Sequence, residues 1–220
     1  MSDISKIIKT RKRVADHGEV YTAEREVNAM LKLVQQETER IDSRFLEPAC
    51  GTGNFLAPIY EKKLEIIKKR YGRSQLEFER YAVVATGSLY GIDILQDNVK
   101  LCRERLFTIF DVLYTSLYKK KGNGIVRNVV QLILKKNILW GDALSLKTVT
   151  RRPTPIIFSE WSLVRGSMIK RRDFSFEELM PGNNGNTNLF RQAEISDLGT
   201  PAFIPSPVQE YPLTHFLSLV

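Results

Sequence analysis

The chain lacks long apolar runs and has few cysteines. Only two occur in 220 residues, Cys50 and Cys102, and they stand in no CxxC or Cys/His cluster, so the sequence indicates neither a disulfide framework nor a metal site. We expect both thiols to be reduced and buried. No run of about 18 apolar residues occurs, and residues 1–13 are polar and basic, unlike the apolar stretch of a secretory signal. These absences predict a cytoplasmic protein with no membrane contact.

Negative charge is less abundant than positive charge. The chain has 33 Lys and Arg against 25 Asp and Glu, a net charge of +8, which favours a polyanionic partner such as DNA without identifying one. Solvated surface faces would give the same basic clusters, so both interpretations stay open. With 43% hydrophobic and 26% charged residues, the composition is that of a globular domain with a real core.

Helical periodicity alternates with short apolar runs up to about residue 160. Helices are predicted at 24–36, with Thr22 as the N-cap, and at 56–72, 95–121 and 125–136, and strands at 44–47, 88–94, 137–140 and 155–158. Such alternation is typical of an α/β fold with a parallel sheet and right-handed crossovers. After residue 160 the chain is rich in proline and has little periodicity. We therefore predict two parts, an α/β domain at 1–160 and an irregular C-terminal extension at 161–220.

Acidic residues follow three of the predicted strands. Glu47 closes the first, Asp93 the second, and Asp142 follows the third. In an open parallel sheet, ligands bind at these carboxyl ends, and the glycine turn at 49–53 allows close backbone approach. Each feature alone has a plain alternative, a tight turn or a helix cap. A nicotinamide fingerprint is disfavoured because Leu56 occupies the third glycine position. The three features in this order favour an adenosyl ligand.

The segment around this turn resembles a known family. Residues 45–56 read FLEPACGTGNFL and are similar to the cofactor motif of adenine-specific DNA methyltransferases, notably the modification subunits of restriction systems. Residues 18–23 (GEVYTA) resemble the family's N-terminal motif, with Ala23 where proline is usual. Residues 91–94 (GIDI) are similar to its ribose-binding motif and 141–144 (GDAL) to its adenine-binding motif. The resemblance covers roughly residues 14–158.

The resemblance implies a Rossmann-like class I methyltransferase sheet with an N-terminal helix, and S-adenosylmethionine as the cofactor. Thr22 would lie near the methionine carboxylate, Asp93 would bind the ribose and Asp142 the adenine amino group. For Phe55 and Ile94, ordinary core packing is the alternative to lining the pocket. The implied cofactor-binding residues are Thr22, Glu47, Pro48, Ala49, Cys50, Gly51, Gly53, Phe55, Asp93, Ile94, Asp142 and Ala143.

The sequence departs from the family where catalysis would occur. Members that methylate the adenine amino group carry an Asn/Asp-Pro-Pro-aromatic tetrad after the fourth strand, which accepts the amino protons and stacks on the flipped base. Here residues 156–162 read IIFSEWS. Ser159, Glu160 and Trp161 are the catalytic candidates at this position, with Glu160 as acceptor and Trp161 as base platform. Packing of Trp161 and ordinary polar residues at a strand end are the alternatives.

The sheet looks truncated after the fourth strand. Relatives continue with further strands and a target-recognition domain, whereas residues 159–220 alone follow here. We expect a protein partner or a second copy of the chain to cover an exposed strand edge. Arg165, Lys170, Arg171 and Arg172 lie where relatives have DNA-facing loops and are predicted to contact phosphate, with a solvated loop as the alternative.

Two functions remain in competition. The first is an enzyme that transfers a methyl group to the adenine amino group of DNA, alone or as the cofactor-binding part of a split methyltransferase. The second is a catalytically degenerate cofactor-binding subunit or scaffold in a restriction or defence complex. Methyl transfer to a protein or small molecule is a weaker third alternative, because the upstream motif favours the DNA family.

Overall fold

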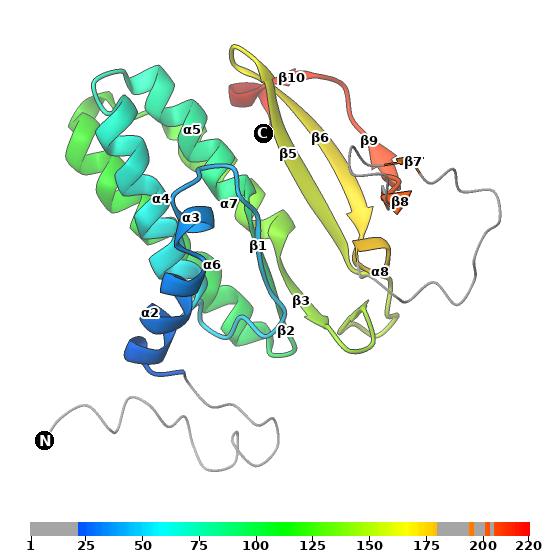
Figure 1. Ribbon diagram of the computed structural model, residues 1–220. Coiled ribbons are helices and arrows are strands. Elements are labelled where there is room, and N and C mark those ends of the chain that lie inside the picture. Colours follow the sequence, from blue (N-terminus) through cyan, green and yellow to red (C-terminus); the bar gives the residue numbers. More distant parts are fainter. Residues whose placement is uncertain (1–21, 180–193, 196–200, 203–204) are drawn as a thin grey trace, which may run out of the picture.

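Helices pack against two four-stranded sheets in the computed structural model, which gives the chain a mixed α/β fold (Figure 1). The structure describes residues 22–179, 194–195, 201–202 and 205–220. The N-terminal motif up to residue 21 and the Asn/Gly-rich tract at 182–188 lie outside the described residues. Among the helices in the described ranges, none has both the length and the apolar character needed to span a membrane.

The first sheet has the strand order β1-β2-β3-β4. Its strands are β1 (Phe45–Glu47), β2 (Leu89–Asp93), β3 (Ile138–Asp142) and the edge strand β4 (Lys147–Thr148). β1 pairs in parallel with β2, and β2 pairs in parallel with β3. β4 is antiparallel to β3. The predicted parallel sheet is confirmed for three strands, and it brings the carboxyl ends of β1, β2 and β3 to one edge.

Helices connect these strands and cover one face of the sheet. They are α2 (Glu24–Leu33), α3 (Gln35–Thr38), α4 (Leu56–Tyr71), α5 (Gln75–Gly87), α6 (Gln96–Tyr118), the 3₁₀ turn η2 (Lys119–Lys121) and α7 (Gly124–Asn137). The predicted first helix is interrupted at Val34, and its N-cap is Ala23 rather than Thr22, without a side-chain cap. α5 was not predicted. It begins at the cap Ser74, whose hydroxyl accepts a hydrogen bond from the Glu77 backbone N–H.

Strand β2 is buried on both faces. All five of its residues are buried, as expected for a strand between two layers. Leu89 packs in the larger core cluster, which the helices supply. Tyr90 and Ile92 belong to a second cluster with Phe158 and Phe176, and the Tyr90 and Phe158 rings meet edge to face at 5.3 Å. The layer opposite the helices therefore comes from the C-terminal part of the chain.

A long hairpin forms the second sheet, contrary to the sequence prediction. Its strands are β5 (Ile157–Arg165) and β6 (Met168–Ser175), and the short strands β9 (Gln209–Glu210) and β10 (Thr214–His215) pair with β6. The predicted fourth strand at 155–158 thus begins an antiparallel hairpin instead of extending the parallel sheet. The predicted boundary at 160–161 falls inside β5, and the predicted irregular tail begins with ordered strands.

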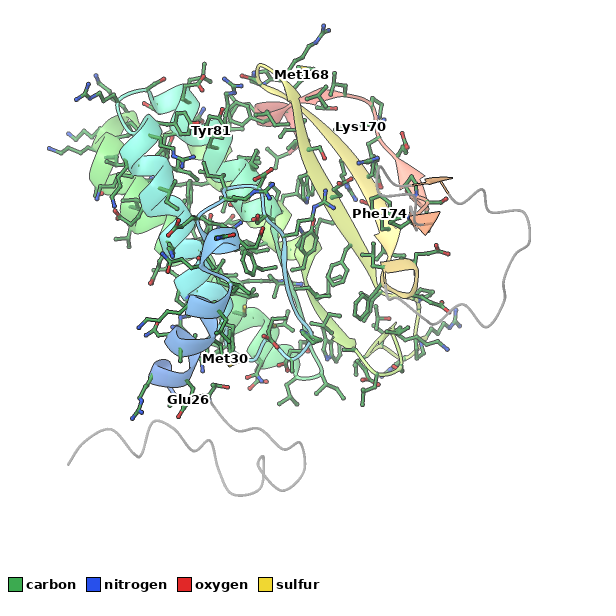
Figure 2. All side chains as sticks on the ribbon, in the orientation of Figure 1. Glu26, Met30, Tyr81, Met168, Lys170 and Phe174 are labelled. Atoms are coloured by element: carbon green, nitrogen blue, oxygen red, sulfur yellow. The ribbon has the colours of Figure 1, made fainter. Side chains whose placement is uncertain are left out.

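The remaining described elements are short. They are α8 (Phe176–Leu179), the pair β7 (Glu194–Ile195) and β8 (Pro201–Ala202), and the 3₁₀ turn η3 (Phe216–Ser218). Figure 2 labels Met168, Lys170 and Phe174 along β6. η3 lies beside the start of β6, and its Phe216 is fully buried in the larger core cluster. The C-terminal residues therefore help to hold the hairpin against the helices.

The direction of β5 decides which residues it brings near each end of the parallel strands. Ile156 packs on Gly141, at the carboxyl end of β3, whereas Trp161 packs on Gly87, just before β2. An added Cβ at Gly87 would lie 2.9 Å from Trp161 Cβ, so only glycine allows this approach. β5 therefore runs antiparallel to β1, β2 and β3, and its later residues lie at their amino ends.

Candidate functional site

A glycine turn joins β1 to α4 at the carboxyl edge of the parallel sheet. The Cys50 N–H donates to the Ile92 carbonyl at 2.8 Å, which ties the turn to the end of β2. Gly51 and Gly53 have φ values of +50° and +87°, a region that favours glycine. An added Cβ at Gly53 would lie 3.0 Å from Cys102 Sγ, but one at Gly51 would meet no atom of the described residues within 4 Å. The backbone at Gly51 therefore faces open space.

Asp93 links this turn to the end of β2. Its Oδ2 accepts a hydrogen bond from the Gly51 N–H at 2.8 Å, and its Oδ1 accepts from the Leu95 N–H at 2.8 Å and from Asn98 Nδ2 at 3.3 Å. The residue is 8% exposed. A carboxylate offers about four lone-pair positions, so these bonds leave capacity for a further donor. Asp93 thus holds the turn in place and can still accept from a ligand.

Glu47 closes β1 beside the turn. It is half-buried, and its carboxylate accepts a hydrogen bond from the Ala49 N–H at 3.3 Å. Burial raises the pKa of Glu47, and the bond from Ala49 opposes part of that rise. Pro48 and Ala49 are exposed, whereas Cys50 is buried in the larger core cluster. A hydrogen bond with Cys102, together with burial, raises the pKa of its thiol.

Asp142 occupies the equivalent position after β3. Its carboxylate accepts hydrogen bonds from the backbone N–H groups of Leu144 at 2.9 Å and Ser145 at 3.3 Å. Bonds from Ser145, and then from Leu144, lower the pKa of Asp142, which favours its charged form. Ala143 is partly buried and packs on the second core cluster. The three acids therefore lie at one edge of the sheet, where the sequence placed them.

Exposed apolar side chains lie next to these acids. Ile94, which follows β2, is 48% exposed, and Leu144, which follows β3, is 96% exposed. Phe55, just before α4, is half-buried. Exposed apolar groups beside polar acceptors are typical of a ligand site. The sequence prediction included Phe55 and Ile94 but missed Leu144, although its place directly after the acid in GDAL could have identified it.

A cleft of about 570 Å³ opens beside the end of β2. It is lined by Gln96, Asp97, Val99, Lys100, Arg103 and Trp140, which belong to the first turns of α6 and to β3. The Trp140 indole N–H donates to the Ile94 carbonyl at 2.9 Å, which fixes the ring next to the chain that follows Asp93. The volume lies within the range of small-molecule sites. None of the predicted cofactor-binding residues lines this cleft, which lies next to the predicted site.

The predicted catalytic residues lie elsewhere. Ser159, Glu160 and Trp161 are buried in β5, with exposures of 1%, 7% and 5%. Glu160 pairs with Arg44, which precedes β1, and Trp161 packs on Gly87, the last residue of α5. These contacts place the three side chains at the amino ends of the parallel strands. The structure therefore does not bring them to the glycine turn.

Most of the predicted DNA-contacting residues are already paired with carboxylates. Lys170 pairs with Glu210 at 2.8 Å, Arg171 with Asp173 at 2.7 Å and Arg172 with Glu160 at 2.6 Å. The Arg171 guanidinium also stacks on the Tyr211 ring at 4.0 Å. Arg165, at the tip of the hairpin, is exposed. Of the four, Arg165 is therefore the residue most available to phosphate.

The site has no support from similarity to known proteins. No protein-family model matches the chain, and no curated protein matches it. Of the predicted cofactor-binding residues, the structure gathers those that follow the three strands. Thr22 is exposed at the start of α2 and does not cap that helix. The interpretation of the site therefore depends on its geometry and on the sequence motifs.

Proposed function

We propose that the chain binds S-adenosylmethionine at the carboxyl ends of β1, β2 and β3, as the Rossmann-like part of a DNA adenine methyltransferase-like protein. The observation that carries the proposal is the open space at Gly51, next to an Asp93 carboxylate that retains acceptor capacity. A glycine with positive φ, no side-chain neighbour and an acid at the next strand end is the arrangement that a close-fitting ligand requires.

Each part of the ligand finds a matching group at this edge. The backbone N–H groups of Thr52, Asn54, Phe55 and Leu56 have no hydrogen-bond acceptor among the described residues and are available to the methionine carboxylate. Asp93 can accept from ribose hydroxyls, and Asp142 from the adenine amino group. Ile94 and Leu144 supply apolar contacts for the adenine ring. The bound ligand would supply a methyl group on a cationic sulfur, which nearby carboxylates such as Glu47 attract.

The second part of the proposal concerns the group that accepts the methyl. The sequence motifs favour the adenine amino group of DNA in a restriction-modification system. The alternative, a subunit that binds the cofactor without turnover, is favoured by one observation. Glu160 and Ser159 are bound to Arg44, Arg172 and Asp173 at the opposite edge of the sheet. Incubation with labelled S-adenosylmethionine and DNA separates the two, since only the enzyme transfers the label.

Substitution of Gly51 by asparagine tests the cofactor site. Asparagine tolerates positive φ, and its side chain would enter space that no described residue occupies, so the fold should persist while the ligand is displaced. We expect S-adenosylmethionine to bind the Gly51→Asn variant at least about tenfold more weakly than the unmodified protein in titration calorimetry.

Gly166 provides a matched control for this substitution. It has a φ of +53° and no atom within 4 Å of an added Cβ, but it lies at the tip of the β5–β6 hairpin. The Gly166→Asn variant should keep full affinity and a similar melting temperature. Equal binding by both variants would mean that the ligand does not occupy the space at Gly51.

A further inference from the structure

A second cavity lies at the amino ends of the parallel strands. Its volume is about 480 Å³, and its walls come from four separate segments: residues 39–44, the end of α4, α5 with the residue after it, and β5. Arg44 precedes β1, and Ser88 precedes β2, so the cavity is at the opposite edge of the sheet from the glycine turn. Neither the cofactor proposal nor the sequence motifs account for it.

The cavity wall carries more guanidinium groups than carboxylates. Arg40, Arg44 and Arg70 line it, against Glu39 and Asp42. Both carboxylates have cationic partners, Lys62 at 3.6 Å for Glu39 and Arg40 at 3.7 Å for Asp42. Arg44 is paired with Glu160, so Arg70 is the guanidinium left for a ligand. Arg70 lies in the last turn of α4 and is exposed, and no carboxylate in the described part of the chain pairs with it.

A buried ammonium group lies behind the same wall. Lys63 is fully buried, and its Nζ donates to the Ile41 carbonyl at 3.0 Å, the Ser43 carbonyl at 2.5 Å and Ser88 Oγ at 2.8 Å. Ile41 and Ser88 themselves line the cavity. No carboxylate among the described residues lies within ion-pair distance of this ammonium. While the Lys63 amine is protonated, its charge adds to the positive potential inside the cavity, where low polarity strengthens such effects.

Aromatic side chains form another part of the wall. Tyr71 and Tyr81 stack at 4.0 Å with an angle of 13° between their rings, and both line the cavity with Trp161. Paired aromatic rings fixed in this way give a rigid apolar surface that suits a planar ring. Guanidinium groups bind phosphate through parallel N–H donors. One cavity thus combines binding groups for two chemically different halves of a ligand, a planar ring and a phosphate.

We propose that this cavity binds a nucleoside 5′-monophosphate unit, with the base against Tyr71 and Tyr81 and the phosphate at Arg70. The unit can come from a free nucleotide or from the phosphorylated 5′ end of a nucleic acid strand. A volume of about 480 Å³ exceeds what a bare anion fills and lies within the range of small-molecule sites. The site does not depend on the cofactor proposal.

Calorimetric titration of the full chain with AMP tests the proposal. The Arg70→Gln variant should bind AMP about tenfold more weakly, since one charge-assisted contact to phosphate is lost. Lys69→Gln is the matched control, because it removes one cation from the same last turn of α4 but does not line the cavity. Its affinity should stay unchanged. The Ser162→Phe variant, which fills the cavity from β5, should also lose binding.

Further titrations distinguish this cavity from the cofactor site and identify the source of the ligand. The Gly51→Asn variant should bind AMP normally, which would separate this cavity from the cofactor site. Inorganic phosphate and adenosine should each bind more weakly than AMP. Tighter binding of a 5′-phosphorylated DNA oligonucleotide than of its unphosphorylated form would identify a strand end as the source, and AMP binding alone a free nucleotide. Failure of AMP to bind, equal binding by Arg70→Gln, or phosphate as tight as AMP would overturn the proposal.

Discussion

Replacement of Asp173 by alanine is expected to lower the free energy of unfolding by roughly 3 kcal/mol. Asp173 is 7% exposed in β6 and accepts four hydrogen bonds. The donors are Ser159 Oγ at 2.7 Å, Arg171 Nε at 2.9 Å, Arg171 Nη2 at 2.7 Å and the Tyr211 hydroxyl at 3.2 Å. Without the carboxylate, the Arg171 guanidinium is left largely buried with no counter-charge, which is the costly half of such a pair.

Arg165→Ala is the control for this variant. Arg165 is exposed at the hairpin tip, so its loss should change stability by less than about 0.5 kcal/mol. Urea denaturation followed by circular dichroism measures both. Equal stability of Asp173→Ala and the unmodified protein would show that the network around β5 and β6 is not structural. The catalytic and DNA-binding interpretation of Ser159 and Arg171 would then regain support.

The sequence predicted the parallel sheet because its strands carry a local signal. Residues 89–93 are apolar or small and end in an acid, as a strand buried on both faces requires, and the structure buries all of them. The glycine turn and the acids Glu47, Asp93 and Asp142 could be placed for the same reason, since each directly follows a strand. A site built from consecutive strand ends is readable from local sequence.

Helix α5 and the hairpin have weaker local signals. α5 buries Phe78, Ala82, Val83 and Ala85 on a broad surface, so no narrow apolar stripe marks it as a helix. In β6 the run Lys170–Arg171–Arg172 has the composition of a solvated loop. It forms a strand because Glu160 and Glu210, which are distant in the sequence, and the neighbouring Asp173 neutralise it. Tertiary pairing of this kind cannot be read from a window of residues.

The second cavity is even harder to predict from local sequence. Its wall joins Arg44, Arg70, Tyr81 and Trp161, which come from four segments of the chain. Trp161 was a catalytic candidate for the other edge of the sheet, the other three belong to no motif, and each alone has an ordinary structural interpretation. Only the direction of β5, which places Trp161 against Gly87, brings them together. Sites at the amino ends of strands therefore need the fold before they can be recognised.

Lys63 should make the stability of the protein depend on pH above neutrality. Burial lowers its pKa to about 7 from an ordinary value of 10.5, while Asp42 and Glu37 oppose part of that shift. Below pH 7 both the folded and the unfolded chain bind the proton. Between about pH 7 and 10.5 only the unfolded chain binds it, so the free energy of unfolding rises with pH in that window.

The Lys63→Met variant isolates this contribution. It removes the buried charge but keeps an unbranched side chain, so its unfolding free energy should lack the rise that Lys63 provides. Between pH 7 and 9 the unmodified protein should gain roughly 2 kcal/mol relative to the variant. The gain follows from the sign of the shift. A base with a lowered pKa in the folded state stabilises the fold only once its proton has left.

Urea denaturation at pH 6, 7, 8 and 9 measures the difference between the two proteins. Lys69→Met serves as the control for loss of a cation, because Lys69 is exposed in the same helix. A constant difference between Lys63→Met and the unmodified protein across this range would show that Lys63 keeps its proton in the fold. The ammonium would then be held by the Ile41 and Ser43 carbonyls and Ser88 Oγ, one for each N–H, and the cavity that it backs would keep its positive potential at alkaline pH.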